Sequence, residues 1–153
     1  MTYMDKLIKK KTFREKFNKE YEELKVSLTI KNKEEIMKFK RIYVAGSYNA
    51  DNIIKALNNI KRGTQVCVKL LKKGYIPFCP WLDFHFHWFD DLTIEDYYRY
   101  SMGWLEVSDC IYVLKNSENS KGTQSEIKRA IELNIPIIYE GDVFYEKELF
   151  WAS

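Results

Sequence analysis

The chain has 153 residues, of which 46% are hydrophobic and 16% aromatic, and its formal net charge is +3. This length predicts one domain with a real hydrophobic core, and the composition excludes disorder over most of the chain. Because the sequence has no apolar run of roughly 18 residues and no apolar signal-peptide core, we expect a soluble cytoplasmic protein without a membrane partner.

The basic residues are concentrated near the start of the chain. Residues 1–41 hold 13 Lys/Arg and 7 Asp/Glu, whereas the remainder is slightly acidic. Apolar residues spaced three to five apart predict an amphipathic helix over residues 3–25, and residues 31–40 are interpreted as a short second helix. We therefore divide the chain into a basic helical arm, residues 1–40, and an α/β domain, residues 41–153. The arm has three open roles: it clamps the domain, mediates dimerisation or contacts an acidic partner such as nucleic acid.

The domain alternates short apolar runs with helical patterns. Cys67, Cys79 and Cys110 are odd in number and widely spaced, which predicts free thiols in a reducing compartment. We expect Gly63 to divide the first helix. Strands are expected at residues 41–45, 75–79, 110–114 and 135–139; helices are expected at 49–73, at 94–107 and from Thr123 onward; an aromatic connection spans 81–92. This order predicts a parallel sheet of order 2-1-3-4 with helices on both faces.

Two polar loops are predicted to meet at one edge of this sheet. Ligands of such sheets bind beyond the carboxyl ends of the strands, where the strand order reverses. At that point lie the loops 46–49 and 115–122. Gly46-Ser47 lets backbone amides approach an anion, and Ser120-Lys121-Gly122 precedes a helix N-terminus that favours negative charge. An ordinary turn explains either loop alone, so the pair is the stronger indication of a site.

Glu126 has two interpretations. With Thr123 three residues earlier it fits a capping box, in which both side chains bind free backbone amides of the first helical turn. As a partly desolvated carboxylate above the sheet, it would instead attack an anomeric carbon, as in retaining glycoside chemistry. Spacing alone favours capping.

The aromatic connection contains Asp83, His85 and His87 in alternation. A strand would place all three on one face, where they would bind a metal. The favoured interpretation is a polar rim over an aromatic floor, so we expect neither a metal nor a cofactor.

Four short motifs, taken in order, resemble the nucleoside 2-deoxyribosyltransferase superfamily. They are RIYVAGSY at residues 41–48, KGYIPFCP at 73–80, WLEVSDC at 104–110 and SKGTQSE at 120–126. The resemblance covers about residues 41–139 and is greatest to a branch of uncharacterised bacterial and phage domains; deoxynucleoside monophosphate N-glycosidases are also similar. It implies a flavodoxin-like fold, a homodimer, and cleavage of the N-glycosidic bond of a deoxynucleoside or its monophosphate.

The resemblance also implies roles for individual residues. Glu126 matches the nucleophile and Tyr43 matches a tyrosine beside it. Ser101 stands where many members carry an aspartate, so the proton needs another donor: Asp96, or Asp83, Asp90 or Asp91 on the aromatic connection. Ser120 matches a phosphate-binding serine, which favours a nucleotide. The expected substrate contacts are Gly46, Ser47, Tyr48, Ser101, Ser120, Gly122 and Thr123.

The sequence thus predicts a nucleotide N-glycosidase or 2-deoxyribosyltransferase that acts on a nucleoside monophosphate. The loss of the aspartate at Ser101 keeps open a non-catalytic nucleotide-binding module. The basic arm keeps open an interaction protein that docks on nucleic acid or another acidic surface.

Overall fold

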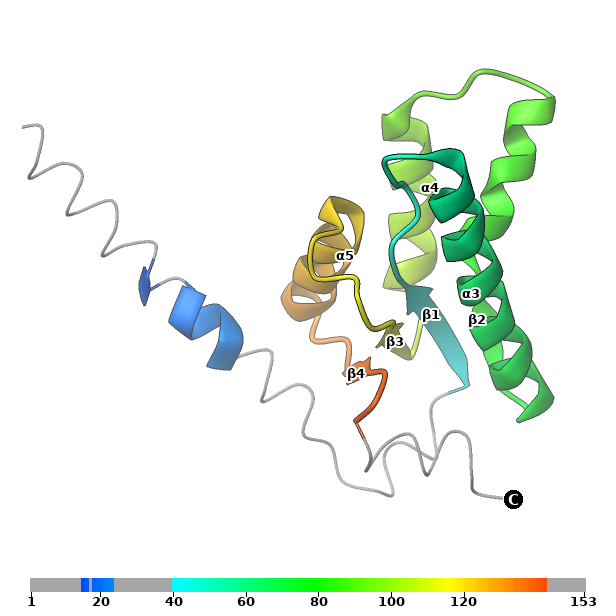
Figure 1. Cartoon of the computed structure of the whole chain (residues 1–153). Coiled ribbons are helices and arrows are strands. Elements are labelled where there is room, and N and C mark those ends of the chain that lie inside the picture. Colours follow the sequence, from blue (N-terminus) through cyan, green and yellow to red (C-terminus); the bar gives the residue numbers. More distant parts are fainter. Residues whose placement is uncertain (1–14, 17, 24–39, 143–153) are drawn as a thin grey trace, which may run out of the picture.

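The computed structural model describes residues 15–16, 18–23 and 40–142 (Figure 1). Its centre is a sheet of four parallel strands, β1 (Arg41–Ala45), β2 (Ile76–Phe78), β3 (Cys110–Val113) and β4 (Ile137–Tyr139). The strands lie in the order β2-β1-β3-β4. The predicted parallel sheet of order 2-1-3-4 is therefore confirmed.

Helices cover both faces of the sheet, because successive side chains of a strand point to opposite faces. Ile42 and Val44 of β1 pack with residues of α3 (Ile53–Lys72). Tyr43 and Ala45 pack with residues of α4 (Ile94–Glu106) and α5 (Lys121–Glu132). Figure 1 shows α3 and α5 on opposite sides of the strands. Tyr43 therefore points toward α4 and α5, where the site is built.

The helix α3 is continuous, so the prediction that Gly63 divides it is wrong. Its N-cap is Asn52, whose side chain accepts a hydrogen bond from the Lys55 amide, and Gly74 follows its end with a φ of 87°. A Cβ added at Gly63 would lie 2.4 Å from the Trp81 ring. The missing side chain makes room for the indole instead of breaking the helix.

The aromatic connection folds into the 3₁₀-helix η1 (Pro80–Trp88). The alternation of Asp83, His85 and His87 therefore does not put them on one face of a strand. Trp81 is buried and its indole N–H donates to the Ser47 carbonyl at 3.1 Å. No group of three or more His, Cys, Asp or Glu that would hold a metal occurs in the part of the chain that the structure describes.

The two later helices begin with side-chain caps. Helix α4 begins with a capping box of Thr93 and Asp96, in which each side chain binds the other residue's amide. Helix α5 begins at Lys121, and its N-cap is Ser120, which accepts from the Thr123 amide. Thr123 is therefore not the cap, and the capping-box interpretation of Glu126 is wrong: Glu126 lies in the second turn.

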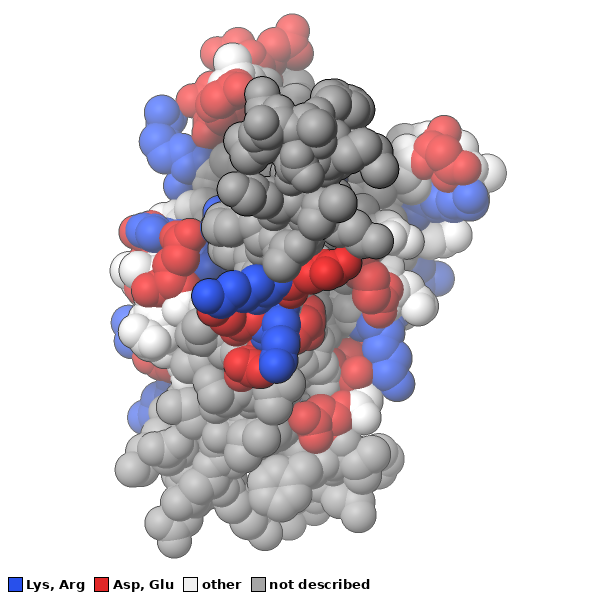
Figure 2. All heavy atoms as spheres, turned by 90° about the vertical axis from the view of Figure 1, so that its left-hand side faces the viewer, with Lys and Arg blue, Asp and Glu red and all other residues white. Residues whose placement is uncertain are grey.

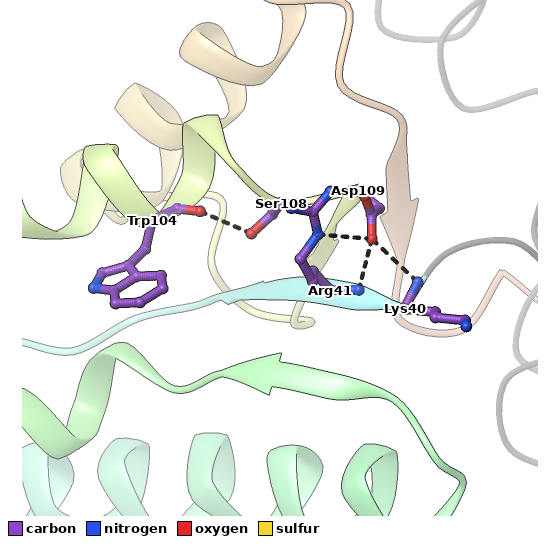
Figure 3. Close-up of polar contacts among 5 residues, drawn as sticks. All are labelled: Lys40, Arg41, Trp104, Ser108 and Asp109. Atoms are coloured by element: carbon purple, nitrogen blue, oxygen red, sulfur yellow. Dashed lines mark hydrogen bonds and ion pairs between the residues drawn. The ribbon is translucent and has the colours of Figure 1, made fainter.

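Asp109 ties β1 to the start of β3 at the amino ends of the strands (Figure 3). Its Oδ2 accepts from the amides of Arg41 at 2.8 Å and Lys40 at 3.3 Å. The Arg41 guanidinium donates to both carboxylate oxygens, at 3.1 and 2.5 Å. These bonds lower the pKa of Asp109 to about 2. We call this group the Asp109 clasp.

Only part of the basic arm falls within the described residues. Residues 15–16 and 18–23 are helical, as expected, and half-buried Tyr21 packs against the core on the α4 and α5 side. Residues 31–39 of the expected second helix and the chain beyond 142 lie outside the description. On the face seen in Figure 2, acidic and basic side chains are interspersed.

Two further observations concern the cysteines and the lengths of the helices. Cys67 and Cys110 are buried and Cys79 is half-buried, and all three are free thiols, as predicted. None of the helices seen within residues 15–16, 18–23 and 40–142 has the length and apolar character that crossing a membrane requires.

Candidate functional site

Glu126 and Tyr43 form the centre of the site. The Tyr43 hydroxyl donates to Glu126 Oε1 at 2.6 Å, although 83 residues separate them in the chain. Ser101 of α4 hydrogen-bonds to Tyr43 as well. Phe78 of β2 stacks on the Tyr43 ring with centroids 5.3 Å apart and fixes its position. The strand β1 and the helices α4 and α5 thereby supply one hydrogen-bonded chain, which runs from the Ser101 hydroxyl through the Tyr43 phenol to the Glu126 carboxylate.

Desolvation controls the charge of Glu126. Although the residue is only half-buried by surface area, the atoms packed around its carboxylate raise the pKa to about 8. The hydrogen bond from Tyr43 opposes this rise, and the negative charge of Asp83 adds to it. Burial and the neighbouring carboxylate hold the pKa of Tyr43 well above its usual range, so it stays a hydrogen-bond donor. In the free protein at neutral pH, Glu126 carries a proton.

Asp83 is a second desolvated carboxyl group at the site. It lies in η1, is 7% exposed, and makes a hydrogen bond with the Tyr48 hydroxyl. Burial raises its pKa to about 6, against the lowering effects of the Tyr48 bond and of His87. Its charge acts on both Glu126 and Tyr43. Sequence reasoning placed Asp83 only among the alternative acids, because its burial beside Trp81 is visible only in the structure.

Asp96, the first acid expected from the sequence, has a different environment. Its carboxylate binds the amide and hydroxyl of Thr93 and pairs with Arg99 at 2.9 Å. These contacts, the Thr93 hydroxyl first, lower the pKa of Asp96. The group is thus an ionised helix cap at the start of α4. Asp90 and Asp91 are exposed, and Asp90 accepts from the Asp91 amide.

The two predicted loops meet at the switch point of the sheet. The Ser47 amide donates to Ser117 Oγ at 3.2 Å, and Ser47 Oγ donates to the Asn116 carbonyl at 3.3 Å. Ser117 is 2% exposed, and sequence reasoning missed it. Asn116 next to it has a φ of 62°, a left-handed conformation that asparagine tolerates better than most residues. The asparagine is the sequence feature that indicates a turn at this point. The Ser47 amide therefore joins the loops.

The start of α5 brings together three further residues expected at the site. Ser120 Oγ accepts from the Thr123 amide at 3.3 Å and from the Thr123 hydroxyl at 3.0 Å. Thr123 is buried, and the position of a Cβ on Gly122 would lie 4.0 Å from the Tyr98 hydroxyl. Glu126 lies in the second turn of the same helix, so the helix N-terminus and the carboxylate belong to one rigid element.

Tyr97 of α4 adds a buried polar atom. Its hydroxyl is buried and has no hydrogen-bond partner among the described residues. Burial is the main cause of the raised pKa of Tyr97, and the negative charge of Asp83 adds to it. Since a buried polar group without a partner costs about 1–3 kcal/mol, a polar atom of a ligand that reached it would recover that free energy.

Comparisons with known proteins give a family and a distant structural likeness. A 2-deoxyribosyltransferase from Bacillus psychrosaccharolyticus is similar in structure, with 15% sequence identity, 71% of this chain and 82% of the other chain covered, and a TM-score of 0.47. A likeness at this level says nothing about activity. No curated relative matches the chain in sequence. Residues 40–140 match the family model described as Domain of unknown function (DUF7768), and the chain belongs to this family.

Proposed function

We propose that the protein cleaves the N-glycosidic bond of a deoxynucleoside monophosphate and that Glu126 is the nucleophile. The observation that carries this proposal is the 2.6 Å hydrogen bond from Tyr43 to Glu126 in a desolvated position at the switch point of the sheet. A carboxylate at a helix surface needs no such partner. The sequence resemblance described above independently gives the same two residues these roles.

The reaction follows from the positions of these groups. Glu126 attacks the anomeric carbon C1′ in its ionised form, and the C1′–N bond breaks as the base leaves with the electron pair. The hydrogen bond from Tyr43 orients the attacking carboxylate and favours its charge. Water or a second base then displaces Glu126 from C1′, which gives hydrolysis or transfer and restores the carboxylate.

The N-terminus of α5 supports a phosphate-bearing substrate. Unpaired amides at the start of a helix and the helix dipole favour an anion there. Lys121 and Gly122 contribute the first amides of α5, and the Ser120 hydroxyl lies beside them. Because Glu126 is on the same helix, a phosphate bound at this end would hold the sugar at a fixed reach from the nucleophile.

The test is release of free base from a panel of deoxynucleoside 5′-monophosphates and the matching nucleosides, followed by chromatography. We expect release from at least one monophosphate, a weaker reaction with its nucleoside, and a loss of at least about 10³-fold in Glu126→Gln. Glu132→Gln, on the exposed side of the same helix, is the matched control and should retain activity.

A 2-fluoro-substituted nucleotide analogue tests the covalent step, since fluorine next to the anomeric carbon slows breakdown of the glycosyl-enzyme. Mass spectrometry should find the adduct on Glu126. Nucleotide binding that raises the melting temperature without any base release would instead favour the non-catalytic module that Ser101 suggests. Base release undiminished in Glu126→Gln would refute the nucleophile.

A further inference from the structure

We propose that Asp83 is the general acid of this site and delivers a proton to the departing base, in place of the carboxylate that is absent at Ser101. The inference rests on the proposed function and names the residue that completes it. It also assigns a purpose to η1, the aromatic 3₁₀-helix that lies between β2 and α4.

The surroundings of Asp83 are unusual for a structural carboxylate. The residue is 7% exposed, yet no Lys or Arg of the described residues forms an ion pair with it. Its hydrogen-bond partner is a phenol, Tyr48, from the loop after β1. Burying a carboxyl group without a cation costs free energy that a purely structural residue does not recover. A single neutral donor orients the group and leaves it able to hold a proton.

The backbone that carries Asp83 is also fixed in place. Trp81, two residues earlier, is buried against Gly63 of α3, and its indole binds the Ser47 carbonyl. The Trp81 bond places the start of η1 beside the loop that follows β1, at the carboxyl end of that strand. The charge of Asp83 acts on Tyr43 and on Glu126, so carboxyl groups from η1 and α5 lie within electrostatic reach of each other.

Asp83 can take over the proton that the reaction needs, because it shares one with Glu126, whereas the other candidates have no such proton to give. Ser101 is a neutral hydroxyl that already bonds Tyr43, and Asp96 is an ionised cap. The titratable groups that act on Asp83 or feel its charge are Tyr48, His87, Tyr97, Tyr43 and Glu126. Between pH values of about 6 and 8 the two carboxyl groups hold one proton between them.

The reactive form is the tautomer in which that proton has moved from Glu126 to Asp83, so that the negative charge lies on Glu126. When Glu126 bonds to C1′, the C1′–N electron pair goes to the base, and the Asp83 proton moves to a nitrogen or oxygen of that base. Asp83 is then ionised and accepts a proton from the attacking water in the second step. The rate should fall below a pH of about 6, where both carboxyl groups are protonated, and above about 8, where neither holds a proton.

The decisive experiment compares two leaving groups. A natural base needs protonation to leave, whereas 4-nitrophenolate, carried on 2-deoxyribose 5-phosphate, leaves without it. We expect Asp83→Asn to lose about 10²-fold to 10⁴-fold in kcat with the natural nucleotide and less than about tenfold with the nitrophenyl substrate. Glu126→Gln should lose activity with both substrates. Asp96→Asn should show no dependence on the leaving group.

The pH profile gives a second readout. Asp83→Asn acting on the nitrophenyl substrate should lose the alkaline limb and keep a single rise with pH, because only Glu126 then titrates; that rise should lie below a pH of about 8, since the Asp83 charge no longer adds to the pKa of Glu126. Tyr48→Phe keeps the carboxyl group but removes its donor, and serves if Asp83→Asn fails to fold. We expect it to impair the natural substrate more than the nitrophenyl substrate.

The outcomes separate the two proposals. Equal losses with both leaving groups in Asp83→Asn, or leaving-group dependence in Asp96→Asn instead, would overturn the role of Asp83 and leave the proposed function standing. If the wild-type protein cleaves neither substrate, the proposed function fails and the role of Asp83 fails with it.

Discussion

Glu126 changes its charge in a pH range in which an exposed glutamate is already ionised. Its pKa is raised from 4.5 to about 8, mainly by burial. Between these values the folded protein holds a proton that the unfolded chain has released. Stability is therefore unaffected by this group below a pH of about 4.5, falls as the pH rises toward 8, and stays at the lower level above it. Keeping this carboxyl group at the site lowers stability at neutral and alkaline pH.

Glu126→Gln should remove that loss. Glutamine is neutral at every pH and its side-chain oxygen still accepts a hydrogen bond from Tyr43. We expect the variant to be about 2–4 kcal/mol more stable than the wild type at pH 9 and nearly equal to it at pH 4. Urea denaturation at a series of pH values measures this. A difference that did not vary with pH would contradict the electrostatic account of the site.

At the scale of elements, η1 is held by one side chain more than by its backbone. A 3₁₀-helix such as η1 has poorer hydrogen-bond geometry than an α-helix, so its own backbone bonds hold it weakly. Trp81 supplies the attachment, with its indole against Gly63 and its N–H on the Ser47 carbonyl. The position of Asp83 thus depends on a glycine in the neighbouring helix.

Gly63→Ala should destabilise the protein although alanine favours helices. The added methyl group would lie 2.4 Å from the Trp81 ring, which is itself 1% exposed. We expect a net loss of about 1–3 kcal/mol in the free energy of unfolding. Gly103→Ala in α4 is the matched control: nothing lies within 4 Å of its Cβ, and it should gain up to about 1 kcal/mol. Equal effects of the two substitutions on the melting temperature would refute the packing argument.

The elements that were predicted well are those whose signal is local. The strands and α4 follow from apolar runs and a capping box, both of which depend on neighbours in sequence. Gly63 was misread because a glycine that breaks a helix and a glycine that admits an indole look the same in sequence. The start of α5 was misread because both Ser120 and Thr123 can cap; burial of Ile127 and Ala130 against the sheet selects the register.

The residues of the site also divide into those with a signal in the sequence and those that depend on contacts distant in sequence. Tyr43, Glu126 and the two loops follow from strand order and motif, because parallel strands bring their carboxyl ends together. Asp83 could not be singled out, since the D-x-H-x-H alternation suggests a strand and η1 has no strand beside it to pair with. Its burial and its bond to Tyr48 depend on Trp81 and on contacts that are distant in sequence.

At the scale of the whole molecule, the two ends of the sheet differ in what they hold. The carboxyl ends carry the desolvated carboxyl groups. The amino ends of β1 and β3 are joined by the Asp109 clasp, in which the Arg41 guanidinium first, and then the Arg41 and Lys40 amides, hold the pKa of Asp109 at about 2 instead of 3.8 (Figure 3). The stability that this group contributes is present above a pH of about 3.8 and is lost as the pH falls through about 2.

Asp109→Asn should lower the free energy of unfolding at pH 7 by about 1–2 kcal/mol, after allowance for partial solvent exposure. The deficit should shrink as the pH approaches 2, because the wild-type carboxylate then becomes protonated. Chemical denaturation across this pH range is the measurement. Asp51→Asn, which breaks an exposed pair with Lys55, is the control and should change little. A deficit that persisted undiminished at pH 2 would rule out the ionic clasp.

The separation of the clasp from the carboxyl ends affects how the chain can accept mutations. Substitutions that adjust a reaction usually reduce stability, and a protein tolerates them only while it has stability to spare. Here strengthened bonds at the amino ends of β1 and β3 can offset such losses without contact with Glu126, Tyr43 or Asp83. Variants for altered substrate preference are therefore best built on a background that is reinforced around Asp109.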